Sequence, residues 1–183
     1  MDSSHIREEG PFREWSFTPE ELLVQTNEFL QRVGYELEPP ANFGSVRPDF
    51  HAKRKTERIT FEIVGMVARH LDAVPEKCAD IKQMKASLGD AADYTIALPP
   101  VNETLLLEFF TQDRGKYYFD IEREKISIWL CNPEERTVWC FLGGPRDRRF
   151  NQHFVSVKLP MNFGEIIKWR LGKKEFEQLM EEE

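Results

Sequence analysis

The sequence predicts an α/β fold in which helices flank a central mixed β-sheet. Residues 47–67 contain two strand-like segments, RPDFHAK and RITFEIVGMV, with a charged turn between them. A helical pattern starts at Pro75, and the strand-like segment DYTIAL follows at residues 93–98. Because strand, helix and strand succeed one another, we expect a right-handed crossover between parallel strands. The first strand pair is a hairpin and therefore antiparallel, so the sheet is expected to be mixed.

A first helix is expected to begin at Thr18. Thr18 is a good N-cap, Pro19 suits the first turn, and Glu21 is placed to complete a capping box. Apolar side chains then recur at helical spacing until Gly34, which is suited to end the helix. The helix that starts at Pro75 is expected to stop at Gly89, and its apolar stripe consists of Cys78, Ile81, Met84 and Leu88.

Further elements are expected after residue 98. Asn102 is placed to cap a third helix through LLLEFFTQD, which ends near Gly115. The segment KYYFDIE alternates like a strand but also fits an extension of that helix. ISIWLC and TVWCFLG predict a strand pair around NPEER, and HFVSVKLP predicts another strand. Residues 163–180 predict a helix that Gly172 weakens.

Length and composition fit one globular domain. The 183 residues are 40% hydrophobic and 31% charged, which separates the chain from disordered proteins. The opening MDSSHIREEG has no apolar core that could act as a signal peptide, and no later apolar run approaches membrane-spanning length. We therefore expect a cytoplasmic protein with no membrane partner. Cys78, Cys131 and Cys140 are expected to be reduced and buried, although Cys131 and Cys140 could face each other across a hairpin.

Basic residues gather in two places despite a net charge of −7. The acidic total argues against nucleic-acid binding through overall electrostatics. The segment KRKTER (53–58), however, carries four positive side chains and one negative side chain, a net of +3, and Arg146, Arg148 and Arg149 form a second cluster. These clusters are either ordinary solvated turns or, if they share a face, a track for phosphate groups.

Asp49 and Glu62 are acids within the two strand-like segments of the hairpin. If the chain turns at Lys55 and Thr56, Asp49 lies directly opposite Glu62. Directly opposed side chains have Cβ atoms about 4.5–5.5 Å apart, so two carboxylates there repel each other unless a cation lies between them. This register predicts a divalent metal site.

An alternative for Glu62 needs no metal. In the same register Arg47 lies opposite Val64, and both Arg47 and His51 point to the same side of the first strand as Asp49. Either one could form an ion pair with Glu62, and the hairpin residues taken alone favour such a pair over a metal ion.

These residues resemble the motif of the PD-(D/E)XK nuclease superfamily, which has the restriction-endonuclease-like fold. The resemblance consists of Pro48-Asp49, Glu62 on the next strand, a helix with IKQMKASL and the strand ADYTIALPP. It covers about residues 18–131, so the single domain 1–183 divides into an N-terminal arm (1–17), a nuclease-like core (18–131) and C-terminal strands and helix (132–183). The resemblance implies that Asp49 and Glu62 hold Mg²⁺ or Mn²⁺, which orients an attacking water.

The chain departs from the motif at Val64, where the family has a lysine two residues after the second acid. Similarity to variants with a migrated lysine directs attention to the next helix. On that helix Lys85 and Lys77 lie within the apolar stripe, and Lys82 lies at its edge. We take Lys85 as the expected catalytic lysine, with Arg47 as a second source of positive charge that could stabilise a phosphate but not act as a base.

Other residues are assigned by the same resemblance. Gln83 is similar in position to the helix glutamine of the RecB-like branch, although the helical wheel places it opposite the apolar stripe. Glu28 resembles an additional acid of some relatives, but ordinary solvent exposure explains its position better. The residues expected to contact nucleic acid are Arg47, Lys53, Arg54, Lys55 and Gln83.

Two functions follow from these expectations. The first is a metal-dependent nuclease that cleaves phosphodiester bonds with Mg²⁺-activated water, with DNA preferred over RNA as the substrate, working as a homodimer or within a larger complex. The alternative is a catalytically inactive nuclease-like fold that serves as a nucleic-acid-binding or protein-scaffold module. Val64 and the acidic net charge favour the alternative. The facing acids favour the nuclease, which is the preferred hypothesis at this point.

Overall fold

The computed structural model describes residues 17–143, 146–147, 150 and 155–156. Within these ranges seven strands form one sheet in the order of the sequence. The strands are β1 (Glu36–Leu37), β2 (Phe50–Lys55), β3 (Thr60–Val67), β4 (Asp93–Leu98), β5 (Ile126–Asn132), β6 (Thr137–Leu142) and β7 (Val155–Ser156). The helices are α1 (Pro19–Arg32), α2 (Val74–Leu88), α3 (Glu103–Thr111) and α4 (Lys116–Glu124), with short 3-10 turns η1 (Leu71–Ala73) before α2 and η2 (Gln112–Gly115) before α4.

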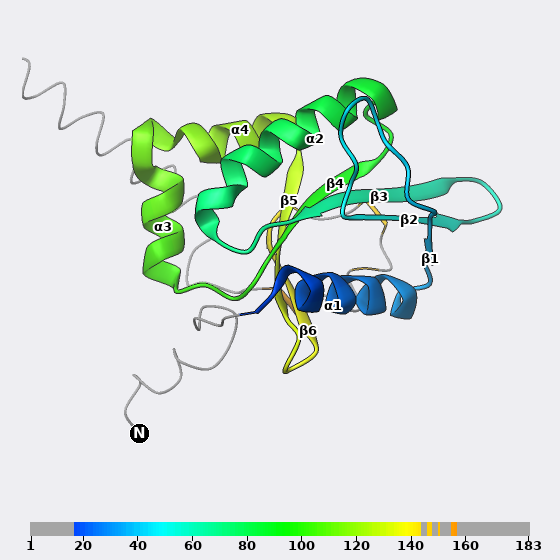
Figure 1. Ribbon diagram of the computed structural model, residues 1–183, viewed down its shortest axis with the longest axis horizontal. Coiled ribbons are helices and arrows are strands. Elements are labelled where there is room, and N and C mark those ends of the chain that lie inside the picture. Colours follow the sequence, from blue (N-terminus) through cyan, green and yellow to red (C-terminus); the bar gives the residue numbers. More distant parts are fainter. Residues whose placement is uncertain (1–16, 144–145, 148–149, 151–154, 157–183) are drawn as a thin grey trace, which may run out of the picture.

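The sheet is mixed, as predicted. β1, β2 and β3 are antiparallel neighbours, and β3, β4 and β5 run parallel. β5 and β6 form the predicted antiparallel pair, and β6 runs parallel to β7. Helices α2, α3 and α4 lie on one side of the sheet and α1 on the other (Figure 1). The α/β class with a central mixed sheet flanked by helices is therefore confirmed.

The caps confirm the predicted starts of α1 and α3 and the predicted end of α2, whereas α3 ends at Thr111 and not near Gly115. Thr18 Oγ1 accepts a hydrogen bond from the backbone N–H of Glu21 at 3.2 Å, and Asn102 Oδ1 accepts one from Thr104 at 2.8 Å. Helix α2 ends at Gly89, whose φ of 86° lies in the left-handed region that glycine tolerates. Each of these ends was visible in the sequence because one local residue type sets it.

The ambiguous segment KYYFDIE forms helix α4. Tyr118 and Ile121, three residues apart, are buried, whereas Phe119 is 45% exposed. This burial follows the helical period, so the strand alternative is wrong. The backbone leaves the helical conformation at Gln112, which is extended, and Asp113, Arg114 and Gly115 all have positive φ, so one continuous helix does not form.

Side-chain alternation along the strands separates two hydrophobic cores. Val64 and Met66 of β3 pack on the side of α2, α3 and α4. Ile63, the residue before Val64, packs on the α1 side with Phe50 and Trp129. Successive residues of the β2–β3 hairpin therefore meet two different environments.

The register of the β2–β3 hairpin differs from the predicted one. His51 pairs with Val64 and Lys53 pairs with Glu62, so neither Asp49 nor Arg47 faces its predicted partner. The reason is the turn: Thr56 Oγ1 accepts hydrogen bonds from the N–H groups of Arg58 at 3.4 Å and Ile59 at 3.1 Å. These bonds stabilise a loop over residues 56–59 in place of the expected tight turn at Lys55 and Thr56.

The three cysteines are free thiols; Cys78 and Cys131 are buried, as expected, whereas Cys140 is half-buried. In the β5–β6 register Cys131 pairs with Val138 and Cys140 pairs with Trp129, so Cys131 and Cys140 are not cross-strand partners. Burial raises the pKa of each of the three thiols to about 12. The thiols are thus protonated and unreactive at neutral pH.

Some expectations fall on residues outside the described ranges. Val155 and Ser156 form β7 within the predicted strand HFVSVKLP, whereas the predicted helix 163–180 and the arginines at 148 and 149 lie outside those ranges. Among the helices that are described, none combines the length and the apolar character needed to cross a membrane.

Candidate functional site

Asp49 lies just before β2 and binds the backbone of β3. Its carboxylate accepts a hydrogen bond from the N–H of Val67 at 2.7 Å, and its own N–H donates to the carbonyl of Gly65 at 3.0 Å. The Asp49 side chain thus extends the β2–β3 ladder by one more hydrogen bond. It is exposed and lies at the level of Met66 on β3.

Glu62 is held by two side chains of β2. His51 Nε2 lies 2.7 Å and Lys53 Nζ lies 3.5 Å from Glu62 Oε2. The sequence alternative in which Glu62 pairs with His51 is therefore confirmed, and pairing with Arg47 is not seen among the described residues. Glu62 is 17% exposed, so these two partners offset most of its lost hydration.

His51 itself is tightly enclosed. Its side chain is 10% exposed, and the ring of Phe43 meets it edge to face at a centroid distance of 5.3 Å. The tautomer with hydrogen on Nε2 donates to Glu62 and leaves Nδ1, which is buried and has no partner in the described part of the chain, as an acceptor. The His51 ring is thereby fixed against Glu62.

The two acids do not fit a shared Mg²⁺ or Mn²⁺ ion. Asp49 and Glu62 point to the same side of the hairpin but are four residues apart along the ladder, which is about 13 Å at the usual rise per residue. Two oxygens bound to one Mg²⁺ lie at most about 4 Å apart, because each bond is about 2 Å long. No group of three His, Cys, Asp or Glu side chains within the described ranges has a geometry that could hold a metal.

The positions that face Asp49 carry no further polar ligand. Met66 lies opposite it, and Val64, the next residue on this side, is fully buried in the core beneath α2. Val64, which stands where the motif would have a lysine, is therefore an ordinary hydrophobic core residue. Within the described ranges, the polar side chains nearest Asp49 are those that line the same small hollow, among them Glu38, Arg47 and His51.

Lys85, the expected catalytic lysine, is directed to a different part of the molecule. Its ammonium donates to the carbonyl of Glu124 at 2.8 Å and lies 3.5 Å from Asp90 Oδ1. It also lies 5.8 Å from the centre of the Tyr94 ring. No contact joins Lys85 to Asp49 or Glu62 within the described residues. The helical wheel placed Lys85 correctly on the inner side of α2, but its ammonium binds the end of α4.

The other residues assigned from the resemblance are dispersed. Gln83 is exposed and accepts a hydrogen bond from Ser45 at 3.0 Å, which ties the β1–β2 loop to α2. Lys82 is exposed and Lys77 half-buried, and Glu28, as expected, is exposed at the surface near Arg136. None of them lies with Asp49 or Glu62 in the contacts described.

The basic segment KRKTER divides between the two sides of the hairpin. Lys53 binds Glu62 on the α2 side, and Lys55 and Arg47 are exposed. Arg54 points to the α1 side and makes two hydrogen bonds of 2.6 Å to Asp147. Lys53 and Arg54 therefore do not form one phosphate-binding surface.

Asp147 is the residue that sequence reasoning missed. It is 1% exposed and accepts hydrogen bonds from Arg54 and from the hydroxyl of Tyr35 at 2.8 Å. These hydrogen bonds raise the pKa of Arg54, and burial followed by Asp147 raises the pKa of Tyr35. No sequence signal indicates this cluster, because Asp147 is 93 residues from Arg54.

Comparison with known proteins yields structural neighbours only. No family model matches the sequence, and no curated protein matches it. An XisH family protein from Nostoc punctiforme PCC 73102 is similar with a TM-score of 0.45 and 14% identity, over 65% of this chain and 96% of that one. An fdxN element excision controlling factor protein from Anabaena variabilis has a TM-score of 0.45 and 13% identity, over 66% and 96% of the two chains.

Proposed function

We propose that this chain is a non-catalytic protein-binding module with a nuclease-like fold. The observation that carries the proposal is the state of the two acids expected to bind metal. Glu62 binds His51 and Lys53, and Asp49 binds the Val67 N–H about 13 Å further along the ladder. Each carboxylate has a structural role, and the lysine that would complete the motif is replaced by a buried valine.

A protein is preferred over a nucleic acid as the partner. Of the basic residues expected to contact phosphate, Lys53 and Arg54 are paired with Glu62 and Asp147, which leaves Lys55 and Arg47 exposed. Arg58 of the same segment is exposed as well, and three exposed cations on a protein of net charge −7 supply little of the phosphate neutralisation that nucleic-acid binding requires. The acidic surface repels a polyanion and is compatible with a protein partner.

A cleavage assay tests the non-catalytic part of the proposal. The full chain is incubated with supercoiled plasmid, single-stranded DNA and RNA in Mg²⁺ or Mn²⁺, beside Asp49→Ala and Glu62→Ala. We expect none of the three proteins to cleave above the protein-free control. Cleavage by the wild type that disappears in both variants would restore the metal-dependent nuclease hypothesis and defeat this proposal.

A binding assay tests the choice of partner. We expect a fluorescent 20-base-pair duplex to show no saturable binding at physiological salt. Tight binding that is lost in Lys55→Glu but retained in Glu134→Lys, an exposed residue of the β5–β6 turn, would instead identify a nucleic-acid-binding module.

A further inference from the structure

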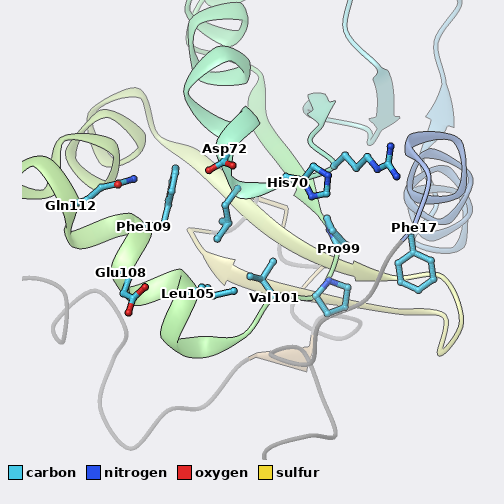
Figure 2. A pocket seen from close by; sticks show the side chains of 12 residues that line it. Phe17, His70, Asp72, Pro99, Val101, Leu105, Glu108, Phe109 and Gln112 are labelled. Carbon is cyan, nitrogen blue, oxygen red and sulfur yellow. The ribbon is translucent and has the colours of Figure 1, made fainter.

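A wide groove lies at the edge of the sheet where β3 and β4 end. Its volume is about 640 Å³, against about 190 Å³ for the hollow beside Asp49. Because β3 and β4 are parallel neighbours, their carboxyl ends meet at this edge. The walls come from the chain after β3, the chain after β4, and α3 (Figure 2). Open α/β sheets commonly bind ligands outside the carboxyl ends of their strands.

The floor of the groove is apolar and open to solvent. Leu71, Val101 and the buried Phe109 line it, and Leu105 remains 41% exposed. Leu105 and Glu108 are three residues apart and lie on one side of α3 along the groove, and Gln112 follows directly after the helix. A small-molecule pocket encloses most of its ligand, whereas this open shape suits a polypeptide segment passing across it.

Two consecutive prolines restrict how such a segment could bind. Pro99 and Pro100 follow β4 directly and line the groove. Neither has a backbone N–H, so this wall cannot support an added β-strand. An occupant must therefore be recognised through its side chains.

Exposed charged side chains of both signs line the groove. Arg69, Asp72 and Glu108 are exposed, and none makes an ion pair or side-chain hydrogen bond with another residue in the described ranges. In Figure 2 Glu108 and Gln112 lie toward one end of the groove, and His70 lies toward the other, with Asp72 between them. Arg69 also lines the groove and directly precedes His70 in the chain, so the groove carries a positive charge next to His70 in sequence and a negative charge on Glu108.

We propose that the groove binds a segment of a partner protein in which a Lys or Arg is separated by apolar residues from an Asp or Glu. The cationic side chain binds Glu108, the acidic side chain binds Arg69, and the apolar residues cover Leu105 and Val101. The opposite charges of Glu108 and Arg69 fix the direction of the segment, while the apolar contact supplies affinity. This assignment rests on the proposed function, since it describes the partner of a non-catalytic module.

A phage-displayed library of random 12-residue peptides provides the test. The library is selected on the full chain in EDTA, without nucleic acid. We expect enriched peptides to carry a basic and an acidic residue on either side of apolar ones. An enriched peptide is then synthesised, and its affinity is measured by fluorescence anisotropy. Glu108→Arg, Arg69→Glu and Leu105→Asp should each lower that affinity about tenfold or more. Phe119→Asp on α4 and Glu134→Arg, both outside the groove, should leave its affinity unchanged.

A charge-swapped pair separates lost contacts from lost folding. The double variant Arg69→Glu/Glu108→Arg should bind a peptide in which the basic and acidic residues are exchanged, and bind the original peptide poorly. No enriched peptide, or peptides that bind the groove variants as well as the wild type, would overturn the proposal. The selection contains no metal and no nucleic acid, so a failure to obtain groove-binding peptides would not change the interpretation of the cleavage assay. Conversely, metal-dependent cleavage would defeat the proposed function without changing a measured peptide affinity.

Discussion

Lys53 and Arg54 are neighbours on β2 but belong to two different ionic clusters. The clusters differ in how far apart their members lie in the sequence and in how deeply they are buried. Lys53 and His51 bind Glu62 within the same hairpin, and Lys53 remains 34% exposed. Arg54 binds Asp147, 93 residues away, with side-chain exposures of 15% and 2%. Tyr35 adds a third hydrogen-bonding group to the second cluster. The comparison indicates that the cluster on the α1 side of the sheet joins distant segments and stabilises the fold, while the cluster on the α2 side neutralises Glu62 within one hairpin.

The largest expected effect comes from breaking the buried cluster. Asp147→Ala leaves the guanidinium of Arg54 and the hydroxyl of Tyr35 without their acceptor, so we expect the free energy of unfolding to fall by about 3–5 kcal/mol. Urea denaturation monitored by circular dichroism measures it. Arg136→Ala, which removes an exposed pair with Glu28, is the matched control and should change stability by less than about 1 kcal/mol. Equal effects of the two substitutions would remove the distinction between the clusters.

Breaking the hairpin cluster should have a smaller effect. Glu62→Ala leaves Nε2 of the enclosed His51 without a partner, and we expect a loss of about 1–2 kcal/mol in the free energy of unfolding. Glu62→Gln retains an acceptor for His51 and should lose less. A gain in stability for Glu62→Ala would show that the carboxylate has no stabilising role in the hairpin.

Removing Lys53 should matter least for stability. Lys53→Met keeps the apolar stem and removes an ammonium that lies 3.5 Å from Glu62 and is 34% exposed. We expect a change below about 1 kcal/mol, and a smaller one in 1 M NaCl because salt screens exposed pairs. A loss as large as that of Asp147→Ala would contradict the ranking of the two clusters.

The smallest expected effect is a change in the pKa of Tyr94. Burial, followed by the charges of Glu62 and Asp90, raises the pKa of Tyr94 to about 12. Its unfolded-state pKa is about 10, so the unfolded chain releases this proton first and the contribution of Tyr94 to stability decreases as pH rises from about 10 to 12. The absorbance titration of the wild type minus that of Tyr94→Phe isolates the phenol. Glu62→Gln should lower the pKa slightly, and no change would show that the Glu62 charge does not reach Tyr94.

The sequence allowed the elements and their faces to be predicted, but not the contacts between distant segments. Local signals such as Thr18, Asn102 and Gly89 located helix ends, because capping depends on residues within one turn. The hairpin prediction placed Asp49 and Glu62 correctly on the same side of the sheet. Because of the loop at Thr56, however, the observed pairing differs from the predicted pairing by two residues on each strand. A shift of that size preserves side-chain alternation and still separates the two acids.

The partners of Lys85 and Arg54 were beyond such reasoning. Lys85 binds the end of α4, a segment whose structure was ambiguous in the sequence, and Arg54 binds a residue 93 positions later. Pairings of this kind depend on how the chain packs as a whole and carry no periodic signal. The same limit applies to the groove, because Arg69, Pro99 and Glu108 come together only at the edge of the folded sheet.

The burial of Phe150 bears on how the chain can be shortened. Its ring is fully buried among Phe29, Tyr35 and Trp129, at centroid distances of 5.2–5.9 Å. A version cut after β6 would lose this ring together with Asp147, and would leave three aromatic rings and a guanidinium uncovered beneath α1. Such a fragment should self-associate, since exposed aromatic surface favours aggregation. The smallest soluble form of this protein should therefore extend past residue 150, well beyond the strands that carry the motif.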